Sequence, residues 1–351
     1  MPEANPSRVD MRAYLDLVGK DMPQPEQFNY EATRDSIRHF SYAVADYNAL
    51  YLDEEYARST RWGGIVAPPG YLYSHGYAAW LSKLPGLRDA DGGDMLEEIN
   101  AGESWEFVRP VRAGDHIYSY GFITRVEAKR GKSIGDFVAI TTQMRYTNQR
   151  GELVAQGFCD WFRYNSPRIA LGGGLGTKYP PLPRGTTTRS VVGPTEFPGT
   201  FPTPARRYFD RRCFEDVNVG DPIPAFEVGP LNASHMAKYN AAMMGTGWDH
   251  VGAAQEGAVP DSFAPGCMRI SWFAAMLVAW AGPDSFVTRM TEKNLEWVLV
   301  GFKVVCGGRV TGKRKEGFRC LVDCELWCDS ELGFRTNVGS AEVEIPGRGR
   351  D

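Results

Sequence analysis

The chain of 351 residues is long enough for two domains of average size, and its 43% hydrophobic and 23% charged residues are those of an ordinary globular protein. No apolar run approaches the roughly 20 residues that span a bilayer, so the sequence predicts no transmembrane helix. The net charge of -4 excludes an overall basic field of the kind that attracts nucleic acid. The N-terminal residues lack the pattern of a secretory signal, which predicts a cytoplasmic protein.

The first half of the chain begins with helical signals and continues with strands. Residues 36–40 have the pattern of a helix start, and an Ala-Pro-Pro-Gly turn follows at 67–70. The stretch 70–81 is apolar around most of its circumference, which predicts a long helix buried against a sheet. The strand-like segments that follow are 103–109, 116–126, 137–146 and 153–164.

A segment dense in Gly, Pro and Thr separates the two halves. Residues 166–207 have the composition of a linker, and their glycine cluster at 172–176 lacks the Lys-Ser or Lys-Thr of a phosphate-binding loop. We therefore expect an N-terminal domain at 1–165 and a C-terminal domain at 208–351.

The second half repeats the order of signals found in the first. A helix start at 234–238 precedes an Ala-Pro-Gly turn at 264–266, and the apolar stretch 266–277 predicts a second buried helix. Three pairs of residues recur at one constant spacing, which indicates a duplicated chain. They are Phe40 with Tyr239, Asp46 with Gly245, and Tyr51 with His250. The strand-like segments of this half are 295–305, 309–312, 318–328 and 336–345.

A long hydrophobic helix wrapped by a curved antiparallel sheet, occurring twice in one chain, predicts an α+β fold of the tandem hot-dog type. Two such units already form the pair that single-unit proteins obtain by dimerising. A monomer would therefore be complete, and a homodimer stays open as an alternative.

The seven cysteines contain no CxxC pair. Cys320, Cys324 and Cys328 alternate as they would along a strand, on one face with Val322 and Leu326. This pattern favours small buried hydrophobic side chains over a metal site.

Several motifs in both halves follow the pattern of one family. In the first half they are Val18-Gly19, residues 45–53, Tyr56-Ala57, residues 62–69 and residues 109–115; in the second half they are residues 217–221, 239–250 and 264–268. Through these residues the chain resembles the MaoC-like hydratase/dehydratase superfamily in its double hot-dog form, with an N-terminal half of the dehydratase type. The stretch 46–69 is the most specific part of the resemblance.

The resemblance implies a hydro-lyase that adds water to an α,β-unsaturated acyl thioester or removes it from a 3-hydroxyacyl thioester. It implies coenzyme A as part of the substrate and neither a metal nor a redox cofactor. Backbone amides at the start of each buried helix would bind the thioester carbonyl, because a helix N-terminus stabilises the negative charge that develops there. The candidate positions are Gly70, Gly266 and Cys267, since glycine permits close backbone approach.

The acid–base pair of the superfamily is split between the halves of this chain. The resemblance implies an Asp and a His five residues apart that hold the reacting water. The first half has Asp46 and Asn48 but places Tyr51 at the His position. The second half has His250 but places Gly245 at the Asp position.

We therefore predict His250 as the principal acid–base residue, because an unperturbed imidazole titrates near pH 6.5. Asp249 or Asp261 could replace the missing carboxylate. Asp46 with Tyr51 is the alternative pair, and a structural role for Asp46 stays open because a tyrosine is a poor base at neutral pH. This assigns the chemistry to the C-terminal half and substrate accommodation to the N-terminal half.

Two further features have both a functional and a structural interpretation. Lys313 and Arg314 lie in a basic hairpin that could contact the phosphates of coenzyme A, or could be a solvated hairpin tip. The aromatic residues Tyr71, Tyr73, Tyr77 and Trp80 could line an acyl pocket, or could pack in the core.

Three functions remain open at this point. The first is the hydration or dehydration of an acyl thioester. The second is a catalytically depleted thioester-binding subunit that partners a hydratase. The third is a dehydratase-like step on an intermediate that does not carry coenzyme A. In each case the expected ligand is a small molecule, with no nucleic acid or membrane as partner.

Overall fold

The computed structural model describes residues 11–22, 27–76, 97–131, 135–164, 205–243 and 263–349. Its main feature is a single ten-stranded antiparallel sheet with the order β1-β3-β4-β5-β2-β7-β10-β9-β8-β6. The strands of the first half are β1 (Asp21–Met22), β2 (Glu97–Phe107), β3 (Ile117–Gly131), β4 (Gly135–Asn148) and β5 (Leu153–Tyr164). Those of the second half are β6 (Pro222–Val228), β7 (Phe286–Asn294), β8 (Val304–Glu316), β9 (Arg319–Ser330) and β10 (Arg335–Glu344).

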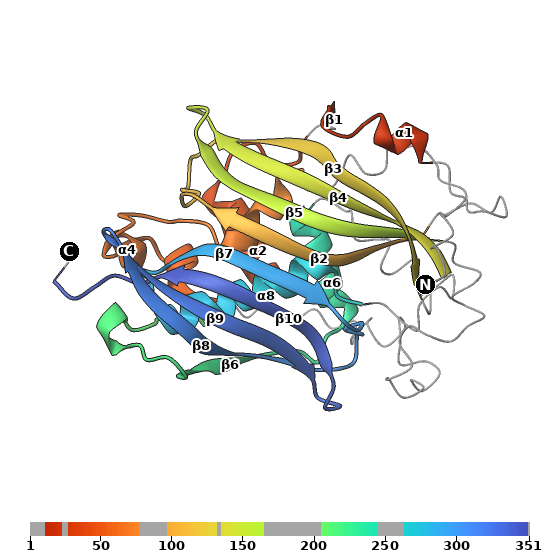
Figure 1. Ribbon diagram of the computed structural model, residues 1–351. Coiled ribbons are helices and arrows are strands. Elements are labelled where there is room, and N and C mark those ends of the chain that lie inside the picture. Colours follow the sequence, from red (N-terminus) through yellow and green to blue (C-terminus); the bar gives the residue numbers. More distant parts are fainter. Residues whose placement is uncertain are drawn as a thin grey trace, which may run out of the picture.

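The sheet repeats itself about its centre. The strands β2 and β7 run side by side there and join the two halves (Figure 1). From β2 outward the order is β5, β4, β3, β1, and from β7 outward it is β10, β9, β8, β6. Each half therefore has the same topology, and the predicted tandem hot-dog architecture is confirmed. The predicted domain limits at 165 and 208 stay a prediction, because residues 165–204 lie outside the described part of the chain.

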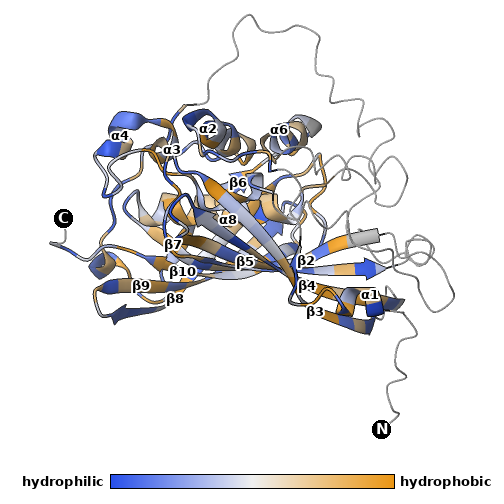
Figure 2. Ribbon diagram, turned by 90° about the horizontal axis from the view of Figure 1, so that it is seen from above, coloured by the Kyte–Doolittle hydropathy of each residue, from blue (hydrophilic) through white to orange (hydrophobic). Residues whose placement is uncertain are grey.

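The main helices lie on one face of the sheet (Figure 2). They are α2 (Arg34–Ala43), α6 (Ala233–Met243) and α8 (Gly266–Ala281), and α2 packs against α6. The shorter elements are α1 (Arg12–Leu15), α3 (Ala49–Leu52), α4 (Glu54–Arg58), η1 (Pro69–Ser74) and η3 (Phe214–Asp216). Among the helices of the described residues, none has the length and apolar composition needed to cross a bilayer.

The helix α8 is the buried helix that the sequence predicts in the second half. Pro265 precedes its first residue, and Gly282, with a φ of 88°, ends it. Apart from Cys267 and Ala279, every residue of α8 is buried, because the helix packs against η1 and against strands of both halves. This explains why its sequence is apolar on all sides rather than along one stripe.

The equivalent element of the first half is different. The sequence predicts one long helix over 70–81, whereas the described part of this segment is the 3-10 helix η1, which ends at Ser74. Residues 77–81 lie outside the described part of the chain. Gly70 explains the close packing of η1, because a Cβ atom there would collide with the Ser271 side chain of α8.

A second expectation is wrong in the C-terminal half. The apolar segment 295–305 is predicted as a strand, but residues 295–303 form a turn-rich connection and the central strand is β7. Trp297 and Leu299 are nevertheless buried, in a small cluster with Phe263 and Phe302. A short apolar run can be buried equally well in an irregular segment, and here residues 297–300 are all buried without forming a strand.

The cysteines of β9 behave as predicted. Cys320, Cys324 and Cys328 are buried on the inner face, and all are free thiols. Cys328 lies opposite Cys306 of β8 with 3.5 Å between the sulfur atoms. These thiols therefore act as core side chains.

Candidate active site

The first turn of α8 offers unpaired amides to a ligand. Within the described residues, the backbone N–H groups of Gly266 and Cys267 have no hydrogen-bond acceptor, whereas those of Met268 and Arg269 bond to the carbonyl of Pro265. The helix is 16 residues long and has no side-chain cap. Both features suit the binding of a carbonyl oxygen on which negative charge develops.

Two asparagines pack against this tip. A Cβ atom at Gly266 would lie 2.9 Å from the amide nitrogen of Asn100 and 3.0 Å from that of Asn294. Asn100 belongs to β2 and Asn294 to β7, and the Asn294 amide donates to the main-chain oxygen of Asn100 at 3.1 Å. The start of α8 therefore sits on the junction between the two halves of the sheet.

Glu103 lies beside Asn100 on β2 and is almost fully buried, with 5% of its surface exposed. Its carboxyl group accepts hydrogen bonds from three side chains, namely the hydroxyl of Tyr73, the indole of Trp105 at 2.9 Å and the amide of Asn100. Donors reach both of its oxygens, so the polar atoms of this buried side chain are satisfied.

Glu292 lies directly opposite Glu103, on β7, and is 4% exposed. One carboxyl oxygen accepts from the Asn337 amide at 2.6 Å, and the other has no partner in the described structure. Burial raises the pKa of Glu292 well above its ordinary value, Arg269 opposes this shift and the Glu103 charge adds to it. The burial of Glu292 therefore favours its neutral form over its charged form.

A thiol and two phenols border the same site. Burial raises the pKa of the Cys267 thiol to about 12, so it is not a thiolate nucleophile at neutral pH. Burial likewise raises the pKa of Tyr146 and of Tyr239 well above 10. All three groups are therefore neutral at neutral pH, and they can donate hydrogen bonds but are poor proton donors.

The first-half candidates gather at a different place. Asp46 is 5% exposed; one carboxyl oxygen accepts from the Asn48 amide at 3.2 Å and the other has no partner among the described residues. Burial raises the pKa of Asp46 to about 7. Asn48 caps α3 by accepting from the amide of Leu50 at 3.0 Å. The preceding residue, Ala45, has a φ of 57°, a conformation that costs energy outside glycine.

Tyr51 is buried next to Asp46. Burial raises its pKa well above 10, and the Asp46 charge adds to the effect, so Tyr51 cannot act as the base at the histidine position. It lines a mostly apolar cavity of about 40 Å³ between the two halves, together with Leu72, Val278 and Phe286 among others. Val278 and Gly266 are 12 residues apart on α8, so this cavity and the helix tip are separated by about 18 Å.

The aromatic residues of η1 do not line this cavity. Tyr71 and Tyr73 are fully packed in the core, where Tyr71 bonds to Ser36 at 2.6 Å and Tyr73 to Glu103. The core-packing interpretation is thus the correct one for these two residues. Tyr77 and Trp80 lie outside the described residues.

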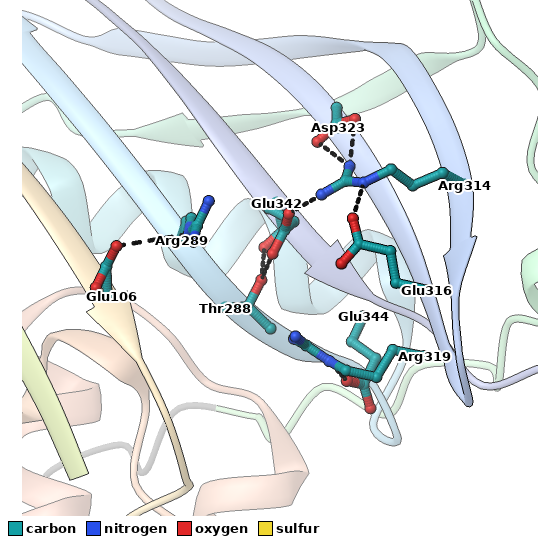
Figure 3. A network of polar contacts seen from close by, with 9 residues as sticks. All are labelled: Glu106, Thr288, Arg289, Arg314, Glu316, Arg319, Asp323, Glu342 and Glu344. Atoms are coloured by element: carbon teal, nitrogen blue, oxygen red, sulfur yellow. Dashed lines mark hydrogen bonds and ion pairs between the residues drawn. The ribbon is translucent and has the colours of Figure 1, made fainter. Parts of the chain in front are cut away.

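Lys313 and Arg314 are both engaged within the protein, which argues against their predicted contact with phosphate. The Lys313 ammonium donates to the carbonyls of Phe214 and Val217 at 2.9 and 2.6 Å. Arg314 lies among three carboxylates, and Figure 3 shows it bonded to Asp323, Glu316 and Glu342. Arg130, on the equivalent hairpin of the first half, is more available, with 80% of its side chain exposed.

Three predicted acid–base residues of the second half cannot be placed. His250, Asp249 and Asp261 lie outside the described residues, and their roles stay predictions. In the part of the chain that the structure describes, no group of three or more His, Cys, Asp or Glu side chains could hold a metal ion.

The sequence interpretation missed the polar cluster below α8. Its members are Asn100, Glu103, Glu292, Asn294 and Asn337. In β2 a signal was present, because Glu103 alternates in phase with Trp105 and Phe107 and must therefore share their buried face. An acidic residue in phase with the core side chains of a strand is unusual enough to indicate a site.

Comparison with known proteins identifies the family. The profile of the FAS1-like dehydratase domain region matches residues 16–157. A UPF0336 protein of Streptomyces griseus is 34% identical over 121 residues, which cover 34% of this chain and 77% of that protein. A probable enoyl-CoA hydratase alpha subunit of Thermomonospora curvata is 32% identical over 149 residues, or 39% of this chain. That match spans 46% of the relative, so the chain covers about half of its length.

The chain belongs to the MaoC-like hydratase/dehydratase superfamily. The solved structure of a MaoC-like dehydratase shares its fold with a TM-score of 0.67 and 19% identity, over 94% of this chain and 98% of the other. A conserved hypothetical protein from Mycobacterium tuberculosis, described as a double hotdog fold, matches with a TM-score of 0.58 and 12% identity, over 97% and 96% of the two chains.

Proposed function

We propose that this protein adds water to an α,β-unsaturated acyl thioester, or catalyses the reverse dehydration of a 3-hydroxyacyl thioester, at the tip of α8. The observation that carries the proposal is the pair of unpaired amides at Gly266 and Cys267, in a buried setting of carboxyl and amide side chains. The name of the Thermomonospora relative, an enoyl-CoA hydratase subunit, supports the same reaction class.

The chemistry of the reaction matches this arrangement. Both directions pass through a state in which negative charge builds on the thioester oxygen, and preorganised N–H donors lower its energy without further reorganisation. Removal of one such donor typically costs about a hundredfold or more in rate. The reaction moves only protons and water, so we propose that it needs neither a metal nor a redox cofactor.

We propose that the carrier is coenzyme A and that the second half supplies the chemistry, with His250 as an acid–base residue. The first half would then accommodate part of the substrate, and the apolar cavity beside Tyr51 is the described space that suits this role. Lys313 and Arg314 donate to acceptors within the protein, so this proposal gives them no contact with the phosphates.

The experiment is a turnover assay of the purified full chain with a panel of enoyl-CoA thioesters of different length and branching. We expect turnover of at least one thioester, and a fall of about 100-fold or more in kcat for His250→Ala, the usual effect of removing an acid–base group. His39→Ala serves as the control, because His39 is exposed on α2. Unchanged turnover in His250→Ala would remove that residue from the mechanism.

A second candidate is a thioester-binding subunit that supports a partner hydratase. The split of the Asp–His pair between the halves favours it, and so does the word subunit in the name of the Thermomonospora relative. Calorimetric binding of CoA thioesters without any turnover would support this second function. Turnover of an acyl intermediate lacking coenzyme A, without affinity for CoA thioesters, would instead support a different carrier.

A further inference from the structure

We propose that a chain of three asparagine side chains supports the first turn of α8 on the sheet, and that it thereby orients the start of this helix toward the substrate carbonyl. The three residues are Asn337 of β10, Asn294 of β7 and Asn100 of β2. They are positioning residues, because they act through the helix. The catalytic part of this inference rests on the proposed function, whereas the support of the helix can be tested without any substrate.

The hydrogen bonds of this asparagine chain run in one direction across three neighbouring strands. The Asn337 amide donates to the side-chain oxygen of Asn294 at 2.6 Å. The Asn294 amide donates to the main-chain and side-chain oxygens of Asn100, at 3.1 and 3.3 Å. The Asn100 amide then donates to a carboxyl oxygen of Glu103. Because β10, β7 and β2 are adjacent in the sheet, the chain crosses the junction between the two halves.

The two ends of the asparagine chain fix the orientation of its amide groups. At one end the Arg269 guanidinium, which can only donate, lies 3.4 Å from the side-chain oxygen of Asn337. At the other end Glu103 accepts from Asn100 at one carboxyl oxygen and from two further side chains at the other. Turning over one amide group would place donor against donor or acceptor against acceptor. One arrangement therefore satisfies all three asparagines together.

The helix α8 contacts the asparagine chain at two points of its first turn. Gly266 packs against it, because a Cβ atom there would lie 2.9 Å from the Asn100 amide nitrogen and 3.0 Å from that of Asn294. Arg269, three residues later on the same side of the helix, is 4% exposed and donates to Asn337. Together the two contacts set the height of the helix start above the sheet and its rotation about the helix axis.

The position of the helix start matters because its free amides act through their geometry. Donors to a developing oxyanion are effective when they are already in place, and a misplacement of about 1 Å can cost about 100-fold in rate. No side chain caps the first turn of α8 in the described structure. The support of this turn therefore comes from the groups packed beneath it, which include Asn100 and Asn294.

This inference leaves the acid–base chemistry with His250, where the proposed function puts it. The side-chain amide of asparagine neither gains nor loses a proton near neutral pH, so the asparagine chain takes no part in proton transfer. It does join the two halves in one site, because Asn100 comes from the first half whereas Asn294 and Asn337 come from the second.

The first experiment measures the support of the helix in the full chain without substrate. We expect Asn294→Ala to speed amide hydrogen exchange about tenfold at residues 266–270, with a smaller change at residues 274–281 of the same helix. Asn148→Ala is the matched control, because Asn148 is a buried asparagine that bonds to its neighbours at the end of β4. We expect the control to change exchange equally in the two segments. Equal changes in Asn294→Ala would overturn the inference.

The second experiment tests the catalytic consequence with the thioester that the wild type converts fastest. We expect Asn294→Ala to lower kcat about 10- to 100-fold with KM changed by less than about threefold, because misplaced amides lose interactions made mainly in the transition state. Asn148→Ala should keep both constants within about twofold of those of the wild type. Wild-type kcat in Asn294→Ala, or a rise in KM alone, would overturn the positioning role.

A variant of conserved shape tests the hydrogen bonds apart from the packing, and it replaces Asn294→Ala if that variant does not fold. Asn294→Asp keeps the size of the side chain and the acceptor for Asn337, but it loses the amide N–H groups that reach Asn100. A side chain that only filled space would tolerate this change. We expect kcat to fall as in Asn294→Ala, and wild-type kcat would contradict the role of the hydrogen bonds.

The two experiments separate this inference from the proposed function. If the wild type converts no thioester, the proposed function fails and the catalytic part of the inference fails with it, but hydrogen exchange still decides whether the asparagine chain supports the helix. If the wild type converts thioesters and Asn294→Ala matches it in exchange and in kcat, the inference fails and the proposed function stands.

Discussion

Glu103 of β2 and Glu292 of β7 lie directly opposite each other at the centre of the ten-stranded sheet, where the two halves of the chain meet. Three side chains donate to Glu103 and one described side chain donates to Glu292. The two buried carboxyl groups therefore have unequal hydrogen bonding, although they occupy paired positions on neighbouring strands. The helix α8 begins near them, and its first residue, Gly266, packs against Asn100 and Asn294 of the same two strands.

The first prediction concerns Gly266. The substitution Gly266→Ala would bring a Cβ atom to 2.9 Å from Asn100 and 3.0 Å from Asn294, so the helix tip or the asparagines must move. We expect a loss of about 1–3 kcal/mol in the free energy of unfolding and at least about a tenfold fall in kcat. Chemical denaturation and turnover measure the two effects. Gly64→Ala is the control, because nothing lies within 4 Å of a Cβ atom there. If Gly266→Ala and Gly64→Ala have the same stability and the same kcat, the close packing of Gly266 against Asn100 and Asn294 is contradicted.

The second prediction concerns Asp46 and pH. Its pKa is raised from 3.8 to about 7 on folding, so the folded state keeps a proton that the unfolded state loses above pH 4. The wild type therefore loses stability as the pH rises from about 4 to about 7, by up to about 4 kcal/mol, and little more above that range. Asp46→Asn, which resembles the neutral form, should lack this loss.

Denaturation of both proteins at several pH values tests this sign. We expect the stability advantage of Asp46→Asn over the wild type to grow between pH 4 and 7 and to be constant above pH 7. An advantage that shrinks over this range would mean that Asp46 is ionised and stabilising in the folded protein. Asp53→Asn is a suitable contrast, because hydrogen bonds from backbone amides lower the pKa of Asp53.

The third prediction concerns Arg314. Glu342 is largely buried, and the Arg314 guanidinium stabilises its negative charge. Arg314→Gln therefore leaves a buried carboxylate with little compensating charge. We expect it to lower the free energy of unfolding by about 1–2 kcal/mol and to leave the KM for a CoA thioester unchanged within about twofold. Arg309→Gln, which removes one exposed ion pair with Glu325, should cost less. If KM rises strongly for Arg314→Gln and not for Arg309→Gln, the result would support the predicted contact between Arg314 and the phosphates of coenzyme A.

The fourth prediction concerns the cavity beside Tyr51. Val278→Leu adds one methylene group toward a space of about 40 Å³ and should raise the free energy of unfolding by about 0.5–1 kcal/mol. If the cavity takes part of the substrate, the same change raises KM for the bulkier acyl groups in the panel. Val310→Leu is the control, because Val310 is buried and does not line this cavity, so extra volume there should destabilise the protein. Destabilisation by Val278→Leu would show that the space cannot accept a side chain.

Much of the fold follows from local pattern. The duplication was visible because each half repeats a helix start, an Ala-Pro turn and a run of strands, and the sheet repeats in the same order from β2 and from β7. The uniformly apolar sequence of 266–277 predicts the buried helix α8 correctly. The strand prediction for 295–303 is wrong, because the apolar side chains at 297–300 are buried in an irregular segment.

The candidate site was predicted in part. Family resemblance indicated the helix start at Gly266 and Cys267, whose amides have no acceptor among the described residues; their role in binding stays a prediction. It gave no reason to examine Glu103 or Glu292. The sequence also could not predict that Lys313 and Arg314 bond to groups within the protein. It shows that a residue is basic, but not which hydrogen-bond acceptors lie near it in the folded chain.

The sequence by itself determined that the chain is a duplicated unit with buried helices, because hydrophobic periodicity and repeated turns act over neighbouring residues. Only the tertiary structure decided that Glu103 and Glu292 face each other below the start of α8. They are far apart in the chain, and the register of β2 against β7 brings them together. The burial of the two carboxyl groups and the donors around them depend on that register, which no single segment of the sequence contains.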